Sequence, residues 1–443
     1  MTEPIATTEP LEKTKRASGF SGADIPAYDD YAHCVHCGLC LNHCPTYKLW
    51  GLEADSPRGR IRQIVLVDQG RLPLGDSFVK HIDQCLDCRA CETACPSGVE
   101  YGKLVEAARS QIEQNYKRPF FSRLARNFVF RQLLPYPRRI AILARMLYLY
   151  QRSGLQSLAR ATGILKLLGL ADRERLLPPI DRKFFFSNLG RTYPAVGHRR
   201  ARVALFAGCI AQVSFSALHE ATIRVLTANG CEVVVPAGQT CCGALAAHAG
   251  VRDAARSLAR TNLGVFLGED FDAIITNAAG CGSTLKEYEH LFSDGTQDHA
   301  KAAAFQKKMR DATEFLANLG MTAHLSSLPL RVTYQDSCHL LHGQKIREAP
   351  RTLLRAIPGL ELAEMSMADY CCGSAGSYNV TETQTSLELL SEKMKHARAT
   401  GAEIIVTANP GCLLQMRAGA EIHSTGQEVV HVIELLDRAL SPR

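Results

Sequence analysis

The sequence predicts an α/β multi-domain protein in which an N-terminal α-helical module is followed by two duplicated α/β units with parallel sheets. Cysteines divide the chain into three regions: two regular runs lie within residues 31–116, no cysteine lies within 117–200, and a repeated motif fills 201–443. At 443 residues the chain exceeds one ordinary core, so several domains are expected. Short apolar runs that alternate with helical patterns in the last region indicate parallel strands.

Composition and cysteine content place the chain among folded proteins of a reducing compartment. Hydrophobic residues make up 46% and charged residues 21%, and only residues 1–30 are expected to form a flexible N-terminal segment. Seventeen cysteines in a long chain that opens with the polar stretch MTEPIATTEPLEKTKR favour metal ligands over the disulfides of a secreted domain. A cytoplasmic location is therefore predicted.

Neither a membrane span nor a nucleic-acid surface is predicted. No run of 18 apolar residues occurs, so the chain is not expected to cross a membrane. The net charge of +7, from 51 basic and 44 acidic residues, is too modest to indicate nucleic acid as a partner.

The first region carries two copies of the pattern C-x2-C-x2-C-x3-C-P. Three thiolates at this spacing can wrap the irons of one cubane cluster from a single tight loop, whereas zinc sites usually take two separated pairs. Gly38 suits the close backbone approach that such a loop needs. Residues 31–116 are therefore predicted to be a two-[4Fe-4S] ferredoxin-type domain. The expected ligands are Cys34, Cys37, Cys40 and Cys44, before Pro45, and Cys85, Cys88, Cys91 and Cys95, before Pro96.

This pattern resembles that of bacterial two-cluster ferredoxins, in which the fourth cysteine of each run binds the other cluster. The resemblance implies that cluster 1 is held by Cys34, Cys37, Cys40 and Cys95, and cluster 2 by Cys85, Cys88, Cys91 and Cys44. Because every iron then carries a protein ligand, the predicted task is single-electron transfer, and no catalytic residue is expected. Arg58 and Arg60 lie either near a cluster or a partner carboxylate, or in a solvated loop.

The last region repeats one structural unit. Cys209, the pair Cys241 and Cys242, and Cys281 reappear as Cys338, the pair Cys371 and Cys372, and Cys412, with offsets of 129, 130 and 131 residues. Such constancy indicates a duplication, with CCG cysteine-rich units expected over residues 201–325 and 326–443. Each motif cysteine is predicted to lie in a loop just after a strand, at the sheet edge where ligands collect in open α/β folds.

These eight cysteines are candidate ligands of additional centres. The alternative is that they are structural, because buried cysteines also behave as small hydrophobic residues. The structural interpretation is favoured for Cys231, which has no counterpart in the second unit.

From about Tyr31 to the C-terminus the chain resembles the iron-sulfur subunit of bacterial glycolate oxidase. The matching stretches are CVHCGLCLNHCPTYKLWG, SPRGRI, DQCLDCRACETACPSGV, AGQTCCGA, GCGSTLKEY, YCCGSAGSYNVT and IIVTANPGC. The same layout occurs in the cluster subunit of anaerobic glycerol-3-phosphate dehydrogenase, and the CCG units alone resemble a subunit of heterodisulfide reductase. In the heterodisulfide reductase pattern the late cysteine begins C-x-x-C, whereas here Thr284 and Gln415 occupy the last position, so each unit has four candidate thiolates.

The glycolate oxidase resemblance implies a complex in which FAD-binding subunits oxidise glycolate to glyoxylate. This chain, which lacks a convincing G-x-G-x-x-G motif, would pass the electrons toward a membrane quinone or another membrane acceptor. Alternatives are the cluster subunit of a glycerol-3-phosphate or D-lactate dehydrogenase, a thiol or disulfide reductase, and a protein that uses iron only structurally. The four thiolates of each CCG unit leave open a simpler cluster, a zinc ion or an empty redox-active thiol pocket.

Residues 117–200 are expected to form a basic, amphipathic, helical linker. Between Lys117 and Arg160 many arginines alternate with large apolar residues, and Pro135 and Pro137 must interrupt any long helix. Helices of this kind bind anionic membrane surfaces, so the linker is a candidate for docking to the cytoplasmic face of the inner membrane or to a flavin subunit. The alternative is a set of ordinary helices that pack over the domain junction.

Overall fold

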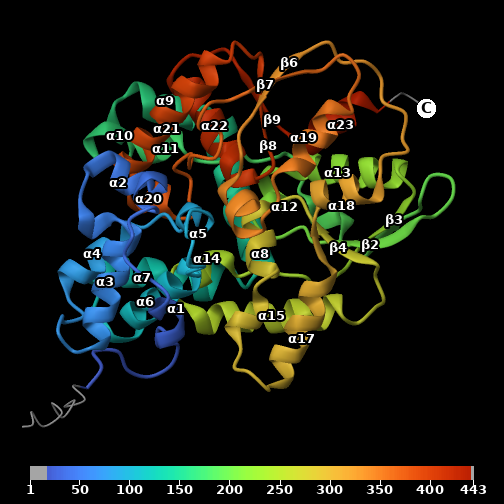
Figure 1. Ribbon diagram of the computed structural model, residues 1–443. Helices are drawn as coiled ribbons and strands as arrows, with labels where there is room; N and C mark the ends of the chain where they lie inside the picture. Colours follow the sequence, from blue (N-terminus) through green and yellow to red (C-terminus); the bar gives the residue numbers. More distant parts are fainter. Residues whose placement is uncertain (1–16, 441–443) are drawn as a thin grey trace, which may run out of the picture.

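The structure, a computed structural model, describes residues 17–440 and begins with a helical module (Figure 1). Its elements are α1 (Tyr28–Ala32), the 3-10 helix η1 (Leu41–His43), α2 (Pro45–Trp50), the 3-10 helix η2 (Glu53–Asp55), α3 (Pro57–Asp68), α4 (Asp76–Asp83), α5 (Ala90–Thr93) and α6 (Tyr101–Asn115). Ser56 caps α3 by accepting a hydrogen bond from the Gly59 amide. Ile64 on α3, Ile82 on α4 and Leu104 on α6 are fully buried in one core.

The expected flexible segment falls partly outside the described residues, which exclude 1–16. For the residues just after them the expectation is wrong, because they pack on the helical module. Phe20 is buried, the Gly19 amide donates to the Val67 carbonyl at 2.9 Å, and the Ser21 amide donates to Gln111 Oε1 at 2.9 Å. This segment is thus part of the module.

The linker is a chain of short helices. They are α7 (Phe120–Asn127), the π-helix η3 (Phe128–Leu133), α8 (Pro137–Arg152), α9 (Leu155–Ala161), α10 (Ile164–Leu167), α11 (Ala171–Arg175) and the 3-10 helix η4 (Phe185–Asn188). As the sequence predicts, the two prolines interrupt the helical path, and Pro137 occupies the first position of α8, where its missing amide costs nothing.

The first α/β unit contains a five-stranded sheet with the order β1-β3-β2-β4-β5. Its strands are β1 (Arg191–Tyr193), β2 (Ala201–Leu205), β3 (Cys231–Val235), β4 (Ala273–Thr276) and β5 (Met309–Asp311). Its helices are α12 (Ala211–Ser214), α13 (Ser216–Ala228), α14 (Ala244–His248), α15 (Arg252–Phe266), α16 (Ala279–Leu285), η5 (Tyr288–Leu291), α17 (Gln297–Lys308) and α18 (Ala312–Leu319). Strand β1 is antiparallel to β3, and the other pairs are parallel. The unit therefore starts at β1, inside the range expected for the linker.

The second unit repeats this topology without the antiparallel strand. Its sheet order is β7-β6-β8-β9, which matches β3-β2-β4-β5, and all pairs are parallel. The strands are β6 (Arg331–Tyr334), β7 (Glu361–Glu364), β8 (Ile404–Thr407) and β9 (Glu428–His431). The helices are the π-helix η6 (His339–Gly343), α19 (Glu348–Arg355), α20 (Tyr378–Thr381), α21 (Thr383–Ala399), α22 (Pro410–Ile422) and α23 (Val432–Ala439).

The two units share one hydrophobic core. Leu205 and Ile275 of the first sheet belong to the same buried cluster as Ile405 of the second, and Arg224 of α13 pairs with Asp437 of α23 at 2.7 Å. In Figure 1 the blue helical module lies on the left, beside the green and yellow first unit and the orange and red second unit. Within residues 17–440, no helix combines the length and the apolar character needed to cross a bilayer.

Candidate metal centres

Two adjacent cavities of the helical module are lined by its cysteines. The first is open to the surface and is lined by Cys34, Cys37, Cys40, Cys91 and Cys95. The second is lined by Cys44, Cys85, Cys88 and Cys91. Cys91 and Tyr101 line both cavities, which therefore share a wall. The fourth cysteine of each run thus lies with the first three of the other run, as the crossed arrangement requires.

The loops hold these thiols inward through backbone conformations that side chains rarely adopt. Gly38 has φ +85°, and a Cβ placed on it would meet Arg58 Nη1 at 2.5 Å, so the tight turn expected at this glycine is present. In the second run, Asp87 and Arg89 adopt φ values of 53° and 59° without being glycine. Such conformations cost free energy and persist where surrounding contacts impose them, often at functional sites.

The spacing of the thiols is wider than a single zinc ion needs. Tetrahedral zinc with Zn–S bonds of about 2.3 Å places its sulfurs about 3.8 Å apart. Among residues 17–440, the metal-ligand side chains whose ligand atoms all lie within 4.8 Å of one another are Asp87, Glu106 and His248, and no three thiols do so. The cavities therefore fit a larger group, such as a cubane cluster.

Burial controls the protonation of the thiols. It raises the pKa of Cys88 and of Cys91 well above the usual value. It is also the largest cause of the raised pKa of Cys34 and of Cys40. Because cluster irons bind thiolates, assembly of a cluster in these cavities must displace these protons.

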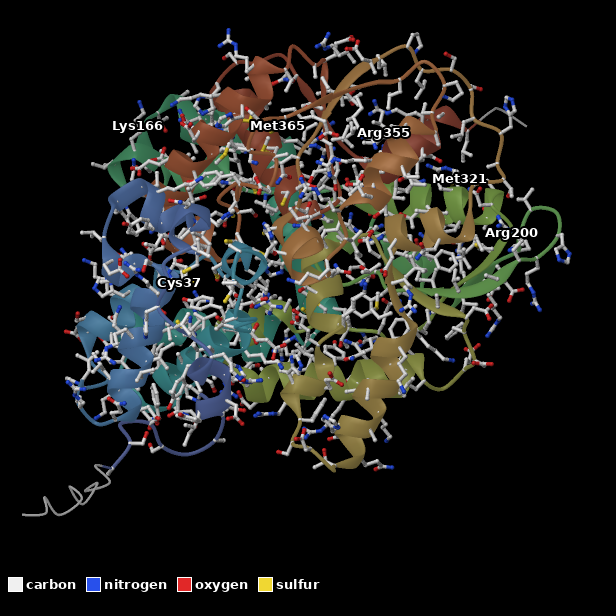
Figure 2. The ribbon with its side chains drawn as sticks, viewed as in Figure 1. Cys37, Lys166, Arg200, Met321, Arg355 and Met365 are labelled. Carbon is white, nitrogen blue, oxygen red and sulfur yellow. The ribbon has the colours of Figure 1, made fainter. Side chains whose placement is uncertain are left out.

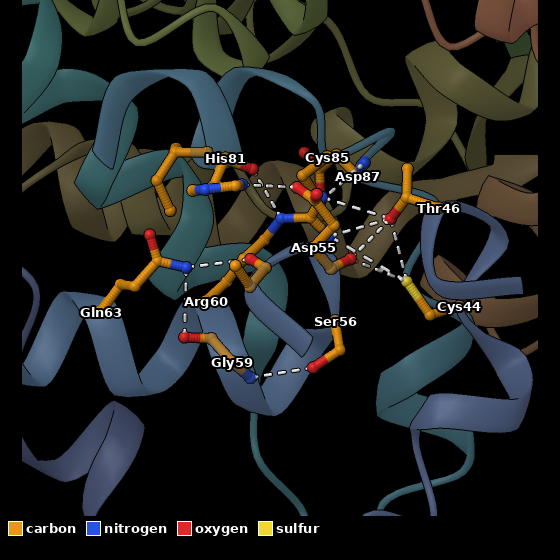
Figure 3. A network of polar contacts seen from close by, with 12 residues as sticks. Cys44, Thr46, Asp55, Ser56, Gly59, Arg60, Gln63, His81, Cys85 and Asp87 are labelled. Atoms are coloured by element: carbon orange, nitrogen blue, oxygen red, sulfur yellow. Dashed lines mark hydrogen bonds and ion pairs between the residues drawn. The ribbon is translucent and has the colours of Figure 1, made fainter. Parts of the chain in front are cut away.

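A buried cation lies against the second cavity. Arg60 is 1% exposed, its Nη1 lies 4.0 Å from Cys44 Sγ, and its Nε donates to the His81 carbonyl at 2.7 Å (Figure 3). Although burial opposes its charge, the neighbouring Cys85, Tyr101, Cys44 and Asp55 raise the pKa of Arg60. Arg60 therefore lies buried beside the cysteines and not in a solvated loop.

Arg58, by contrast, lies at the rim of the first cavity. Its Nε pairs with Glu53 Oε1 at 2.6 Å, and its Nη1 donates to the His36 carbonyl at 3.1 Å. The side chain remains 31% exposed, so its charge is better screened by water than that of Arg60.

A buried ionic cluster joins the second cysteine loop to the first α/β unit. His248 Nδ1 lies 2.7 Å from Glu106 Oε1 and 3.1 Å from Asp87 Oδ2, and Arg89 pairs with Glu106 and with Glu287. Despite its burial, the hydrogen bonds to the two carboxylates raise the pKa of His248 to about 9. Because Arg89 and protonated His248 already neutralise the carboxylates, we interpret this cluster as a lock between domains rather than as a metal site.

The first CCG quartet lies at the carboxyl ends of β2, β3 and β4, against the linker. Cys209 Sγ lies 3.4 Å from Cys241 Sγ, and the neighbouring Cys281 contributes to the raised pKa of Cys242. Phe130 of η3 belongs to the hydrophobic cluster that surrounds these cysteines, and Cys209 also packs against the cluster formed by Ile140 and Ala144 of α8.

The second CCG quartet lies at the equivalent edge of the other sheet, against the helical module. Cys338 and Cys371 interact electrostatically, as do Cys372 and Cys412, and both interactions affect the pKa values of these thiols. Asn409 Nδ2 donates to Cys412 Sγ at 3.4 Å, while Asn409 Oδ1 accepts from the Gly280 amide at 3.2 Å. Asn409 thereby connects this quartet to the first turn of α16, which carries Cys281 of the first quartet.

The expectation that every motif cysteine lies in a loop is wrong for three of them. Cys281 lies in α16 and Cys412 in α22, both within the first turn, and Cys338 has helical backbone immediately before η6. A thiolate in the first turn of a helix as long as α22 is stabilised by the helix dipole, so the helical position of Cys412 still suits ligation. Cys231, for which a structural role is favoured, lies in β3 and is fully buried in the shared core.

Sequence reasoning missed the residues that act across domains. His248 and Glu106 are separated by 142 positions, and the local sequence around either carries no metal-binding or catalytic pattern. Lys393, which is fully buried on α21 within the second unit, was also missed, because nothing in the local sequence indicates that a lysine is buried there. Burial lowers its pKa to about 8, although Cys372 and Cys371 favour its charged form.

Comparison with known families agrees with this layout. Residues 30–99 match a 4Fe-4S dicluster domain, residues 121–177 match the linker region of the glycolate oxidase iron-sulfur subunit, and residues 203–286 and 332–417 each match a cysteine-rich domain. The chain is thus an iron-sulfur protein whose two α/β units belong to one domain family.

Individual relatives cover nearly the whole chain. A probable glycolate oxidase iron-sulfur subunit of Bacillus subtilis (strain 168) is 42% identical, over 91% of this chain and 93% of the relative. The glycolate oxidase iron-sulfur subunit of Escherichia coli (strain K12) is 32% identical, over 92% of this chain and 93% of the relative. One fumarate reductase (CoM/CoB) subunit of Methanothermobacter marburgensis is 29% identical, over 82% of this chain and 73% of the relative. The chain therefore belongs to the family of glycolate oxidase iron-sulfur subunits, which are subunits of an oxidoreductase.

Proposed function

We propose that this chain is the electron-transfer subunit of a glycolate oxidase complex. In this proposal FAD-binding partner subunits oxidise glycolate to glyoxylate, and this chain passes the electrons toward a quinone-type acceptor. The observation that carries the proposal is the pair of adjacent cavities that share Cys91 and Tyr101 as a wall. Two carriers held in these cavities lie next to each other.

The residues at the cavities fit two [4Fe-4S] clusters. Cys34, Cys37, Cys40 and Cys95 would hold the first cluster, and Cys85, Cys88, Cys91 and Cys44 the second. When bound, each cluster supplies reversible one-electron oxidation and reduction. The chain supplies the thiolates, buries the four cysteines of the second cavity, and places the Arg60 charge beside Cys44. All oxidation of substrate is assigned to the partner.

The first cavity is the better candidate for exchange of electrons with the partner. Cys37 is exposed, and Figure 2 shows it on the helical module, whereas the four cysteines assigned to the second cavity are all buried. Val35 and Leu39, on either side of Cys37, are exposed apolar side chains. Exposed apolar residues around an open cofactor cavity suit a protein contact.

We further propose that the chain is cytoplasmic and binds peripherally to the inner membrane through α8. Ile142, Met146 and Leu149 point away from the protein with exposed fractions of 64%, 63% and 58%. On the same helix Ile140 and Ala144 are buried against the first unit, so α8 is held with its other apolar face outward. Arg138 and Arg152 are exposed beside that face, and their charge complements anionic lipid headgroups.

The proposed electron transfer is tested with the complex purified anaerobically. Iron and sulfide are measured per chain, and EPR spectra are recorded after addition of glycolate, D-lactate or glycerol 3-phosphate. We expect at least about eight irons, as two cubane clusters require, and reduction by glycolate alone. Reduction only by D-lactate or by glycerol 3-phosphate would assign the chain to a different dehydrogenase, and clusters that no donor reduces would contradict the proposed relay.

A further inference from the structure

An open groove on the helical module begins at the mouth of the first cavity. His36 and Arg58 line both the cavity and the groove, so the two are continuous. Glu53 of η2 and Arg62 of α3 also line the groove. Cys37, which Figure 2 labels on this module, is exposed in the first cavity. A group bound in the groove would therefore lie beside the cluster proposed for that cavity.

The positive charge of the groove comes from alternate residues of α3. Arg58 is paired with Glu53 at 2.6 Å, and the buried Arg60 with Asp55 at 3.4 Å (Figure 3). Both acids belong to η2, which thus supplies a counter-charge to the first two arginines. Arg62 is exposed, and no carboxylate among residues 17–440 pairs with it. The third arginine of the series therefore lacks a counter-charge within the described part of the chain.

Arg58 and Arg62 lie on the same face of α3. They are four residues apart, and side chains at this spacing are neighbours on a helix. Like charges at this spacing repel each other. Glu53 pairs with Arg58 and not with Arg62, so the repulsion is only partly offset. An anionic group in the groove would neutralise both guanidinium groups at once, and the groove therefore favours an anionic occupant.

Apolar side chains surround the same cavity mouth. Val35, Leu39 and Leu52 are exposed by 70%, 57% and 54%. Val35 also lines the first cavity, Leu39 follows Cys37 by two residues, and Leu52 directly precedes Glu53 of the groove. Protein contacts combine an apolar centre with a polar rim. Because a free inorganic anion would use the arginines alone, the combination indicates a protein surface as the occupant.

We propose that this face binds an acidic surface segment of the FAD-binding partner. Its carboxylates contact Arg62 and Arg58, and its apolar side chains cover the exposed apolar residues around Cys37. This inference rests on the proposed electron relay and deepens it, because it names the chemistry of the surface that delivers the electrons. The membrane contact is assigned to α8, on the linker, which leaves this face for the donor. Opposite charges across such a contact favour the encounter of the two proteins, and salt weakens them.

The test measures binding of the cluster-loaded full chain to separately purified FAD-binding subunits under anaerobic conditions. Arg62→Glu reverses the charge of the unpaired arginine. Arg71→Glu makes the same change at an exposed arginine beyond the other end of α3. At low ionic strength we expect the Kd of Arg62→Glu to be at least about tenfold weaker than that of the parent chain, and the difference to shrink near about 0.5 M salt. Arg71→Glu should bind like the parent chain.

The integrity of each variant is checked independently of binding. Iron, acid-labile sulfide and the midpoint potentials of the clusters are measured in every chain. Because Arg62 is exposed and lies outside the cysteine runs, these values should equal those of the parent chain. Arg62→Gln removes the charge without adding an acid, and its Kd should fall between those of the parent chain and Arg62→Glu. It also takes the place of Arg62→Glu if the charge reversal lowers the iron content.

The apolar part of the contact has its own pair of variants. Leu52→Ser removes an exposed apolar side chain that is not adjacent to a cysteine, and Val380→Ser makes a comparable change on the second unit. We expect Leu52→Ser to weaken binding at least about threefold at low and at high salt, because apolar burial is not screened. Val380→Ser should have no effect. A Kd of Leu52→Ser equal to that of the parent chain would overturn the apolar centre of the contact.

The outcomes separate this inference from the proposed function. If Arg62→Glu bound as tightly as the parent chain, or if salt did not affect the parent chain, the acidic contact would be wrong. The relay would still stand if glycolate reduced the clusters of the complex. If salt-dependent binding sensitive to Arg62→Glu were found but glycolate reduced no cluster, the contact would stand and the relay would fail.

Two other results would also overturn the inference. Arg62→Glu could bind phosphatidylglycerol vesicles more weakly than the parent chain while its binding to the FAD-binding subunits is unchanged. The face would then be a lipid contact. A parent chain that does not bind the FAD-binding subunits at all would refute both the contact and the proposed complex.

Discussion

Arg60 Nη1 lies 4.0 Å from Cys44 Sγ inside the helical module, where the guanidinium is almost completely removed from water. A positive charge in such a place stabilises the reduced form of a neighbouring cluster, which carries one more negative charge. The residue therefore links a local hydrogen-bond network to the potential of the cluster proposed for the second cavity. The Thr46 hydroxyl, which lies 3.2 Å from both Arg60 Nη1 and Cys44 Sγ, completes this network.

Arg60→Gln is expected to make the midpoint potential of one cluster more negative. A shift on the order of 60 mV corresponds to about 1.4 kcal/mol for one electron. Arg60→Lys keeps the charge and is expected to shift the potential less. EPR-monitored redox titration measures both variants, and Arg58→Gln, at the open rim of the first cavity, is the matched control with a smaller expected effect. A potential unchanged in Arg60→Gln, with iron content intact, would refute this electrostatic role.

The crossed ligation is tested by pairs of substitutions. In the double variant Cys37→Ser/Cys95→Ser both changes fall on the first cavity, so one cluster with about four irons should remain. In Cys88→Ser/Cys95→Ser the changes fall on different cavities, and both clusters should be damaged. Iron content and the EPR spectrum of the reduced chain distinguish the two cases. Retention of one intact cluster by the second variant, and not by the first, would indicate that each run holds its own cluster.

The ionic lock at His248 predicts a pH-dependent stability. The pKa of the His248 imidazole is about 9 in the folded chain, against an ordinary value of 6.5. The protonated imidazole therefore adds to the free energy of unfolding, fully below about pH 6.5, and this contribution is lost as the pH rises through about 9. Four ionisable groups face the His248 imidazole. Asp87 and Glu106 favour its protonated form, and Arg89 and His339 oppose it. We expect the parent chain to exceed His248→Gln in free energy of unfolding by on the order of 2–3 kcal/mol near pH 6.5, and by much less near pH 9.5.

Chemical unfolding of both chains under anaerobic conditions, at several pH values, measures this difference. Comparing the two chains removes the contributions of other titrating groups. His299→Gln, at a partly exposed histidine that lies 3.3 Å from an exposed carboxylate, is a control that should show no such trend. A constant difference between the parent chain and His248→Gln across this pH range would show that the imidazole acts by packing alone.

The sequence correctly predicts the parts of the structure that depend on local spacing. The cysteine runs are local patterns, because each loop must wrap one cluster, and the duplicated sheets follow from apolar runs at repeated positions such as β2 and β6. The remainder depends on contacts between distant segments. The contact between Arg89 and Glu287 depends on how two domains pack. The burial of Phe20 and of Lys393 depends on contacts between distant segments inside one domain, and no short pattern encodes them.

The proposed membrane contact is tested on the outward face of α8. Ile142→Ser/Met146→Ser removes two exposed apolar side chains whose full burial would each be worth roughly 1.5–3 kcal/mol. We expect binding to phosphatidylglycerol-containing vesicles, measured by co-sedimentation, to weaken at least about tenfold, and binding of the parent chain to weaken with added salt. Val380→Ser, at an exposed apolar residue of the second unit, is the control that should leave vesicle binding unchanged. If the double variant bound vesicles normally but no longer co-purified with the flavoprotein subunits, the face would be a protein contact, and the lipid assignment would be wrong.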